Sequence, residues 1–98
     1  MDGQGFDCDS SRGTLYQYNY SHDNEGGFML FCQGSSVDSV VRYNISRNDR
    51  FALFTNSGGT ARVYHNVFHI GKGMDTQVNF PGAAGKMKIH NNIFLNEA

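Results

Sequence analysis

The sequence predicts an all-β chain folded as a right-handed parallel β-helix, a solenoid of about four coils with almost no helix. Four asparagines, Asn19, Asn44, Asn66 and Asn92, recur in similar settings at intervals of 25, 22 and 26 residues. A second column of positions lies 11 or 12 residues before them and repeats at nearly the same intervals. Agreement between two columns indicates one supersecondary unit stacked on itself.

Each repeat contains short β-branched and aromatic runs bounded by Gly, Asn, Asp and Ser, which is typical of strands. In the second repeat we expect strands at 28–32 and 40–43, a turn at Asn44, a short strand at 45–46 and a polar turn at 47–50. No window shows a sustained 3.6-residue apolar period. Equivalent strands one coil apart must run in the same direction, so we expect them to pair in parallel, with crossovers of one hand.

Alternation along these strands predicts three inward stacks. The stacks are Cys8, Cys32, Phe54 and Phe80, then Tyr16, Val41, Val63 and Ile89, and, after the asparagine turn, Ile45, Val67 and Ile93. Cys8 and Cys32 would then lie on adjacent coils about 4.8 Å apart. A disulfide is one interpretation, because cysteine Cα atoms ~4.4–6.8 Å apart can be bridged, and two stacked buried thiols are the other.

The asparagine column has a structural explanation. Stacked turns leave backbone donors and acceptors that must be paired, and an inward asparagine amide can bond both neighbouring backbone and its copies in adjacent coils. Asparagine also tolerates the left-handed backbone of such a bend. We therefore expect a scaffold role for these residues, and also for the adjacent His65 and His90.

Composition limits the chain to one small domain, residues 1–98, with coils at about 1–24, 25–49, 50–73 and 74–98. The net charge of −1 provides no basic footprint for nucleic acid. No apolar run approaches the ~18 residues of a membrane-spanning helix, so membrane insertion is not expected. The start has no signal-peptide pattern, and neither end resembles a solenoid cap. We expect an uncapped fragment of a larger protein.

The repeated YNxS and NNIF turns cover essentially the whole chain. They resemble the turns of the right-handed parallel β-helix family of pectate lyases and related carbohydrate-active proteins. The opening GQGFDCD is similar to a segment in which paired aspartates of some polysaccharide lyases hold calcium. Asp7 matches that pattern, whereas Gly3 and Gln4 stand where the family has aspartates. The resemblance implies a polysaccharide or glycan partner and a secreted or periplasmic parent protein.

Polar candidates gather on the first sheet and the turns beside it. If Cys8 points inward, alternation turns Asp7 and Asp9 outward together. The nearby turns carry His22, Asp23, Glu25, Arg47, Asp49 and Arg50.

One chemistry that this set would suit is uronate β-elimination. It needs a cation at the sugar carboxylate and a base for the adjacent proton. Calcium held by Asp7, Asp9 and Asp23 is a candidate cation, and Arg47 and Arg50 are candidates for either role.

The second chemistry is glycoside hydrolysis, which needs two carboxyl groups about 5–10 Å apart. Asp7 or Asp9 together with Glu25 would supply them. The sequence does not choose between a polysaccharide lyase and a glycoside hydrolase. A non-catalytic, adhesin-like β-helix that binds glycans or acts as a spacer is the alternative, and a scaffold without any site is a third interpretation.

The same alternation turns Met29, Phe31, Phe51 and Leu53 outward as an apolar patch. Large exposed patches mark binding surfaces. Phe31 and Phe51, with His22 and Glu25, are candidates for contact with a saccharide. Our preferred interpretation is burial against a missing part of the parent chain or a second copy, with self-association through the open coil ends as a further route.

Overall fold

The computed structural model describes residues 3–9, 11–32, 37–56, 59–77 and 87–97. Eleven short strands form three sheets, in which every strand pairs in parallel with its neighbours. Sheet 1 contains β1 (Gln4–Asp9), β4 (Gly27–Cys32) and β7 (Phe54–Asn56). Sheet 2 contains β2 (Leu15–Gln17), β5 (Ser39–Arg42), β8 (Ala61–Tyr64) and β10 (Met87–His90). Sheet 3 contains β3 (Tyr20–His22), β6 (Ile45–Arg47), β9 (Val67–Ile70) and β11 (Ile93–Asn96).

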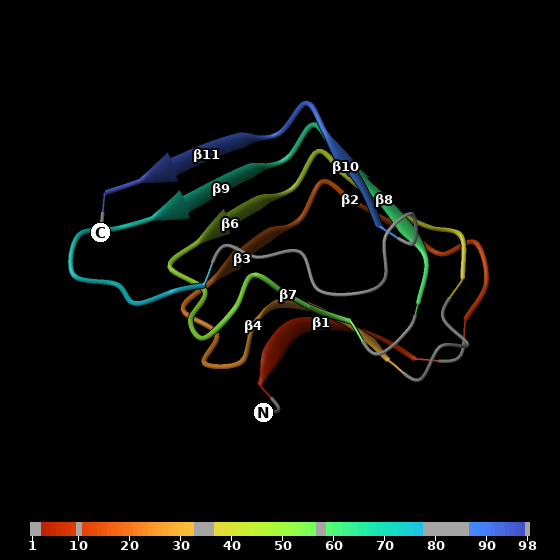
Figure 1. Ribbon diagram of the computed structural model, residues 1–98, viewed down its shortest axis with the longest axis horizontal. Coiled ribbons are helices and arrows are strands. Elements are labelled where there is room, and N and C mark those ends of the chain that lie inside the picture. The colour runs from red at the N-terminus through yellow and green to blue at the C-terminus, as the bar shows by residue number, and fades with distance from the viewer. Residues whose placement is uncertain (1–2, 10, 33–36, 57–58, 78–86, 98) are drawn as a thin grey trace.

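In the first three coils the described chain visits the three sheets in the same order, and successive coils lie one behind another (Figure 1). β10 and β11 extend sheets 2 and 3 by one further strand each. Equivalent strands are joined by long crossovers, which parallel pairing requires. Among the described residues there is no helix, and so no helix that could cross a membrane. The predicted all-β class with parallel, stacked strands is confirmed.

The four asparagines bond to one another in series at the corner between sheets 2 and 3. The backbone N–H and the Nδ2 amide of Asn44 both donate to Oδ1 of Asn66, at 3.0 Å each. Asn19 donates in the same way to Asn44, and Asn66 to Asn92. Each side chain therefore ties its own coil to the next one.

The left-handed backbone at this corner belongs to the residue before each asparagine. Tyr18, Tyr43, His65 and Asn91 have φ values of 55–58°. A non-glycine residue in this region costs about 1–2 kcal/mol. The expectation that the asparagines themselves take it was wrong, because their N–H and side chain must both point at the next coil.

The interior is filled by aromatic and aliphatic side chains. The stack of Tyr16, Val41, Val63 and Ile89 is confirmed by the register of sheet 2 and by burial. Phe28 packs edge-to-face on the rings of its neighbours, with its centroid 5.6–5.8 Å from theirs. Such arrangements are favoured between aromatic rings, and here they link sheet 1 to sheet 3.

The register of sheet 1 differs from the prediction by one residue between β1 and β4, and by three residues between β4 and β7. Cys8 pairs with Phe31, and Asp9 pairs with Cys32. The predicted column of Cys8, Cys32 and Phe54 is therefore wrong. Phe80 and the side chains of both cysteines lie outside the described part of the structure, and the interpretations of the cysteines as a disulfide or as two thiols stay predictions.

A bulge at the start of β4 lies on the side that faces β7. The N–H groups of Phe28 and Met29 both donate to the carbonyl oxygen of Leu53, so two residues oppose one. Phe6 pairs with Met29 and Met29 with Phe54, steps of 23 and 25 residues. Both pairings differ from the prediction by an odd number of residues, and such a slip moves the side chains of a strand to the other face.

The predicted outward patch is consequently wrong in three of its four members. Met29, Phe31 and Leu53 are fully buried and belong to the core. Phe51 is 43% exposed. Phe31 cannot contact a saccharide on the outer surface, since its side chain points into the molecule.

The predicted third stack has the correct register but the opposite orientation. Ile45 pairs with Val67, and Val67 with Ile93. Ile45 and Ile93 are 47% and 57% exposed, whereas Ser46 and Phe68 beside them are buried. The inward asparagine accounts for this, because the residue after it in an extended chain must point outward.

Replacing Asn66 by alanine should lower the free energy of unfolding by about 3 kcal/mol, because several buried hydrogen-bonding groups lose their partners. Those groups include the carbonyl oxygens of Val41 and Tyr64, which accept from its amide. Urea unfolding followed by circular dichroism measures the change. Asn19→Ala, at the half-buried first position, should cost about 1 kcal/mol. Equal losses in the two variants would contradict this account.

Candidate functional site

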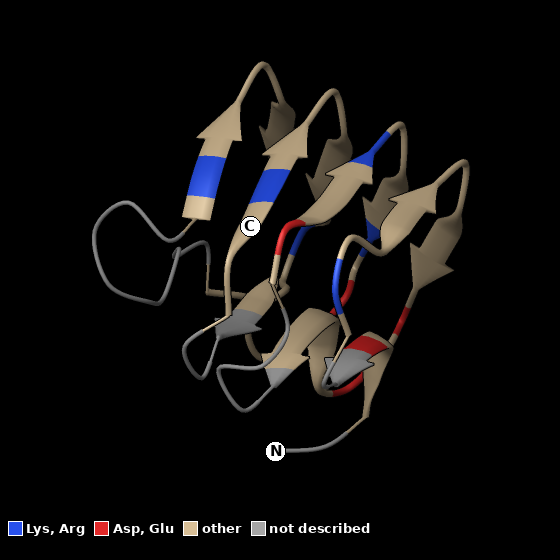
Figure 2. Cartoon of the chain, turned by 90° about the vertical axis from the view of Figure 1, so that its right-hand side faces the viewer, with Lys and Arg blue, Asp and Glu red and all other residues tan. Residues whose placement is uncertain are grey.

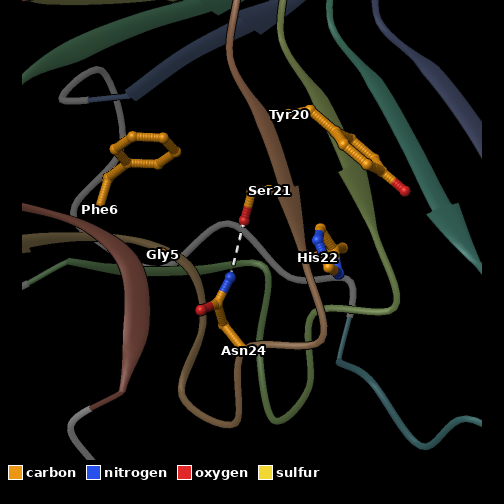
Figure 3. Close-up of a pocket in the computed structure, with 6 residues that line it drawn as sticks. All are labelled: Gly5, Phe6, Tyr20, Ser21, His22 and Asn24. Carbon is orange, nitrogen blue, oxygen red and sulfur yellow. Dashed lines mark hydrogen bonds between the residues drawn. The ribbon is translucent and has the colours of Figure 1, made fainter.

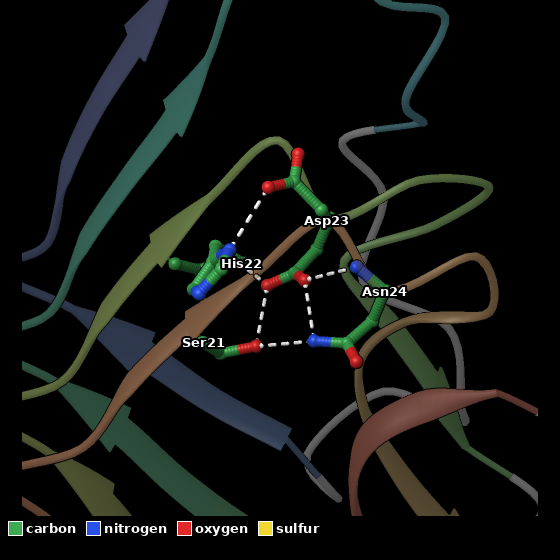
Figure 4. Close-up of polar contacts among 6 residues, drawn as sticks. Ser21, His22, Asp23 and Asn24 are labelled. Carbon is green, nitrogen blue, oxygen red and sulfur yellow. Dashed lines mark hydrogen bonds and ion pairs between the residues drawn. The ribbon is translucent and has the colours of Figure 1, made fainter.

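A buried carboxylate organises the corner between sheets 3 and 1. Asp49 is 0% exposed. Its Oδ2 accepts from the hydroxyls of Ser21 at 2.7 Å and Ser46 at 2.5 Å. Its Oδ1 accepts from the backbone N–H and the side-chain amide of Asn24 at 3.0 and 2.8 Å. Four neutral donors thus satisfy a carboxylate, which accepts but cannot donate when ionised (Figure 4).

This network joins the turns of successive coils. Asn24 belongs to the turn after β3, and Asp49 to the turn after β6. The backbone N–H of Arg50 donates to the carbonyl of Asn24, and Oδ1 of Asn48 accepts from the N–H of Gly71 in the next coil. The corner therefore holds the exposed side chains of these turns at fixed positions.

The charged side chains that the sequence singled out lie on the outer side of this corner. His22, Asp23, Glu25, Arg47 and Arg50 are all exposed. Nδ1 of His22 lies 2.8 Å from Oδ2 of Asp23. The hydrogen bond from His22 lowers the pKa of Asp23, and the charges of His22, Arg47 and Arg50 lower it further. Asp23 is thus suited to accept hydrogen bonds from a ligand, not to act as an acid.

A pocket of about 240 Å³ opens beside the Asp49 network (Figure 3). It is lined by Gly5, Phe6, Tyr20, Ser21, His22 and Asn24. A Cβ at Gly5 would lie 2.6 Å from Oγ of Ser21, so only glycine lets β1 approach β3 this closely. Both strands are at the edge of their sheets. The pocket therefore lies at the first-coil end of the stack.

Asp7 and Asp9 follow directly after the part of β1 that lines this pocket. The start of β1 touches the turn that carries Glu25, because the N–H of Gly26 donates to the carbonyl of Gly3 at 3.0 Å. At ~3.3 Å per residue, Asp7 and Asp9 lie about 13 and 20 Å beyond Gly3 along the strand. The expected pairing of either aspartate with Glu25 stays a prediction.

Asp7 and Asp9 occupy alternate positions of β1. Asp7 is exposed, as predicted, and the side chain of Asp9 lies outside the described part of the structure. Alternate positions on a strand are about 6.6 Å apart, and the two carboxyl groups of a glycosidase are about 5–10 Å apart. This spacing makes Asp7 and Asp9 a further candidate pair.

The expected calcium site gains no support. Among the described residues no group of three or more His, Cys, Asp or Glu side chains gathers where it could hold a metal ion.

Sequence reasoning missed the roles of Ser21, Asn24, Ser46 and Asp49. The signal was present in the first two coils. A serine stands two residues after Asn19 and after Asn44, and an Asn or Asp stands three residues after each serine. Asp49 was assigned to a solvated turn, because a charged residue is rarely buried without a cation.

Comparison with known proteins gives two matches, both to lacto-N-biosidases, and no family model matches the chain. The chain is 38% identical over 97 residues to a lacto-N-biosidase of Bifidobacterium longum. The aligned region is 97% of this chain and 6% of that protein. It superposes on the crystal structure of the GH136 lacto-N-biosidase from Eubacterium ramulus with a TM-score of 0.83 and 38% identity, covering 15% of that chain. Both are carbohydrate-active glycosidases, and neither match is to a lyase.

Asp49→Ala should lower the free energy of unfolding by about 3 kcal/mol, because the buried hydroxyls of Ser21 and Ser46 lose their acceptor. Thermal and urea unfolding measure the loss. Asp75→Ala, at an exposed carboxylate, should change stability by less than about 0.5 kcal/mol. If both variants unfold alike, Asp49 does not organise the corner.

His22→Ala should raise the pKa of Asp23 toward its ordinary value of 3.8, because the carboxylate loses its hydrogen bond and a nearby positive charge. Carbon-detected NMR titration of the Asp23 carboxyl measures the shift. Because the folded-state pKa is lowered, any contribution of Asp23 to stability is present above pH 3.8 and is lost as the pH falls through the folded-state pKa. An unchanged pKa in the variant would show that His22 does not set it.

Proposed function

We propose that this chain is a β-helix segment of a glycoside hydrolase that acts on glycans carrying a lacto-N-biose unit. The observation that carries the proposal is 38% identity over 97% of the chain to proteins named lacto-N-biosidases, together with a TM-score of 0.83. The segment is 15% of the length of the solved chain, so the activity of the whole protein is part of the proposal.

In this proposal Asp7 and Asp9 are the two catalytic carboxyl groups. One carboxyl group would protonate the leaving glycosidic oxygen, and the other would act as nucleophile or activate water. Their positions on alternate residues of β1 support this assignment. A lyase mechanism finds no parallel in the two relatives.

The turn residues would act at a distance from the reacting bond. Arg47 and Arg50 lie close enough to Asp23 to lower its pKa, and His22 lines the pocket beside Gly5 and Phe6 of β1. We assign His22, Arg47 and Arg50 to hydrogen bonds with sugar hydroxyls farther along the glycan.

The test is release of p-nitrophenol from a p-nitrophenyl lacto-N-bioside by the chain and by variants. The scan covers every carboxylate of the N-terminal segment, Asp2, Asp7 and Asp9, as Asp→Asn. Loss of Asp7 or Asp9 should lower kcat by about 100-fold or more while binding is kept. Asp75→Asn serves as a matched control and should leave kcat unchanged.

The chain covers only 15% of the solved relative. This favours a second candidate function, a segment that binds the glycan without cleaving it. In that case calorimetry detects binding of the bioside but no product forms. A folded chain that neither binds nor cleaves it would overturn both candidates.

A further inference from the structure

The described strands of sheet 2 place three cationic side chains and no carboxylate on its outer face; Asp38, just before β5, forms an ion pair with Arg12. Alternation places two rows of side chains on this face, across β2, β5, β8 and β10. One row is Leu15, Val40, Arg62 and Lys88, and the other is Gln17, Arg42, Tyr64 and His90. Basic positions follow one another on neighbouring strands of this face (Figure 2). We call these eight residues the basic face.

Two of its cations are direct neighbours. Lys88 pairs with Arg62 in the register of β10 and β8, so their backbones are about 4.8 Å apart. Like charges directly opposite each other destabilise a sheet. Within the described part of the chain, the ion pairs join other groups, such as Arg12 with Asp38 at 3.5 Å. An anion that bridged Arg62 and Lys88 would remove the repulsion.

The third cation is held in place by its neighbours. Nε of Arg42 donates to Oε1 of Gln17 at 3.0 Å, and Nη1 donates to the hydroxyl of Tyr64 at 3.1 Å. Its Cζ lies 5.6 Å from the ring centroid of Tyr43. These contacts orient the guanidinium and use two of its five N–H groups. The bond with Tyr64 raises the pKa of Arg42, and a preorganised guanidinium can bind a carboxylate in bidentate fashion.

We propose that the basic face binds a carboxylated glycan. Arg42, Arg62 and Lys88 would contact the carboxylates, and Gln17 and Tyr64 offer amide and hydroxyl groups for sugar hydroxyls. The exposed Leu15 beside Val40 gives an apolar surface for sugar rings. A long nucleic acid fits less well, because the chain as a whole is negatively charged.

This site is separate from the proposed catalytic one. Asp7 and Asp9 lie on sheet 1, whereas the basic face lies on sheet 2. Binding at the face can therefore be measured whether or not the chain hydrolyses a bioside.

The experiment is calorimetric titration of the chain with an oligogalacturonide and with its neutral methyl ester. The acid form should bind at least about tenfold more tightly, because only it offers charge-assisted hydrogen bonds. Its affinity should fall as salt rises. Arg62→Gln with Lys88→Gln should weaken it about tenfold. Arg42→Lys, which keeps the charge but loses the fork, should weaken it about threefold.

The matched control for Lys88→Gln is Lys72→Gln, which removes the same charge from an exposed position outside the face and should leave the affinity unchanged. Circular dichroism checks that each variant is folded. Equal affinity for acid and ester, equal weakening by the control, or no binding by the folded chain would overturn the proposal. The proposal would also be overturned if a DNA duplex bound as tightly as the acidic glycan and lost affinity in the Arg62 and Lys88 variant. The face would then bind polyanions in general.

Discussion

The hydrogen bonds between asparagines of successive coils are the constraint on which the rest of this structure depends. The amide of Asn66, for example, accepts hydrogen bonds from the backbone and the side chain of Asn44 and donates to the carbonyls of Val41 and Tyr64. Hydrophobic burial stabilises the interior but is non-directional. The directional bonds at this corner set the position of one coil on the next, and hence the register of sheets 2 and 3.

The second polar corner surrounds Asp49. Its carboxylate accepts hydrogen bonds from two coils, and these bonds fix the turns after β3 and β6. Between the two corners the chain has only three or four residues per strand in sheet 3. Short strands held by polar turns at both ends leave their outward positions free for recognition. His22 and Arg47 occupy such positions on sheet 3, and Arg42 and Arg62 on sheet 2.

The recurring asparagines were enough to predict the class, the parallel pairing and the stack that contains Val41 and Val63. They were not enough for sheet 1, because turns of unequal length separate it from the asparagine corner and its strands pair in a different register. That register places Met29 and Phe31 in the core and not on the predicted surface. Asp7 is exposed as predicted, since its outward position does not depend on its partner in the next coil. Asp49 was missed because a buried carboxylate satisfied by serine and asparagine looks like a solvated turn in the sequence.

Amide hydrogen exchange of the intact chain tests the central claim most directly. The N–H groups of Asn44 and Asn66 donate to the next asparagine and should exchange as slowly as those of the core strand at Val63. The N–H of the exposed turn residue Lys72 provides the fast reference. Exchange of the asparagine amides at the rate of Lys72, while Val63 stays protected, would contradict a coil spacing fixed by this corner.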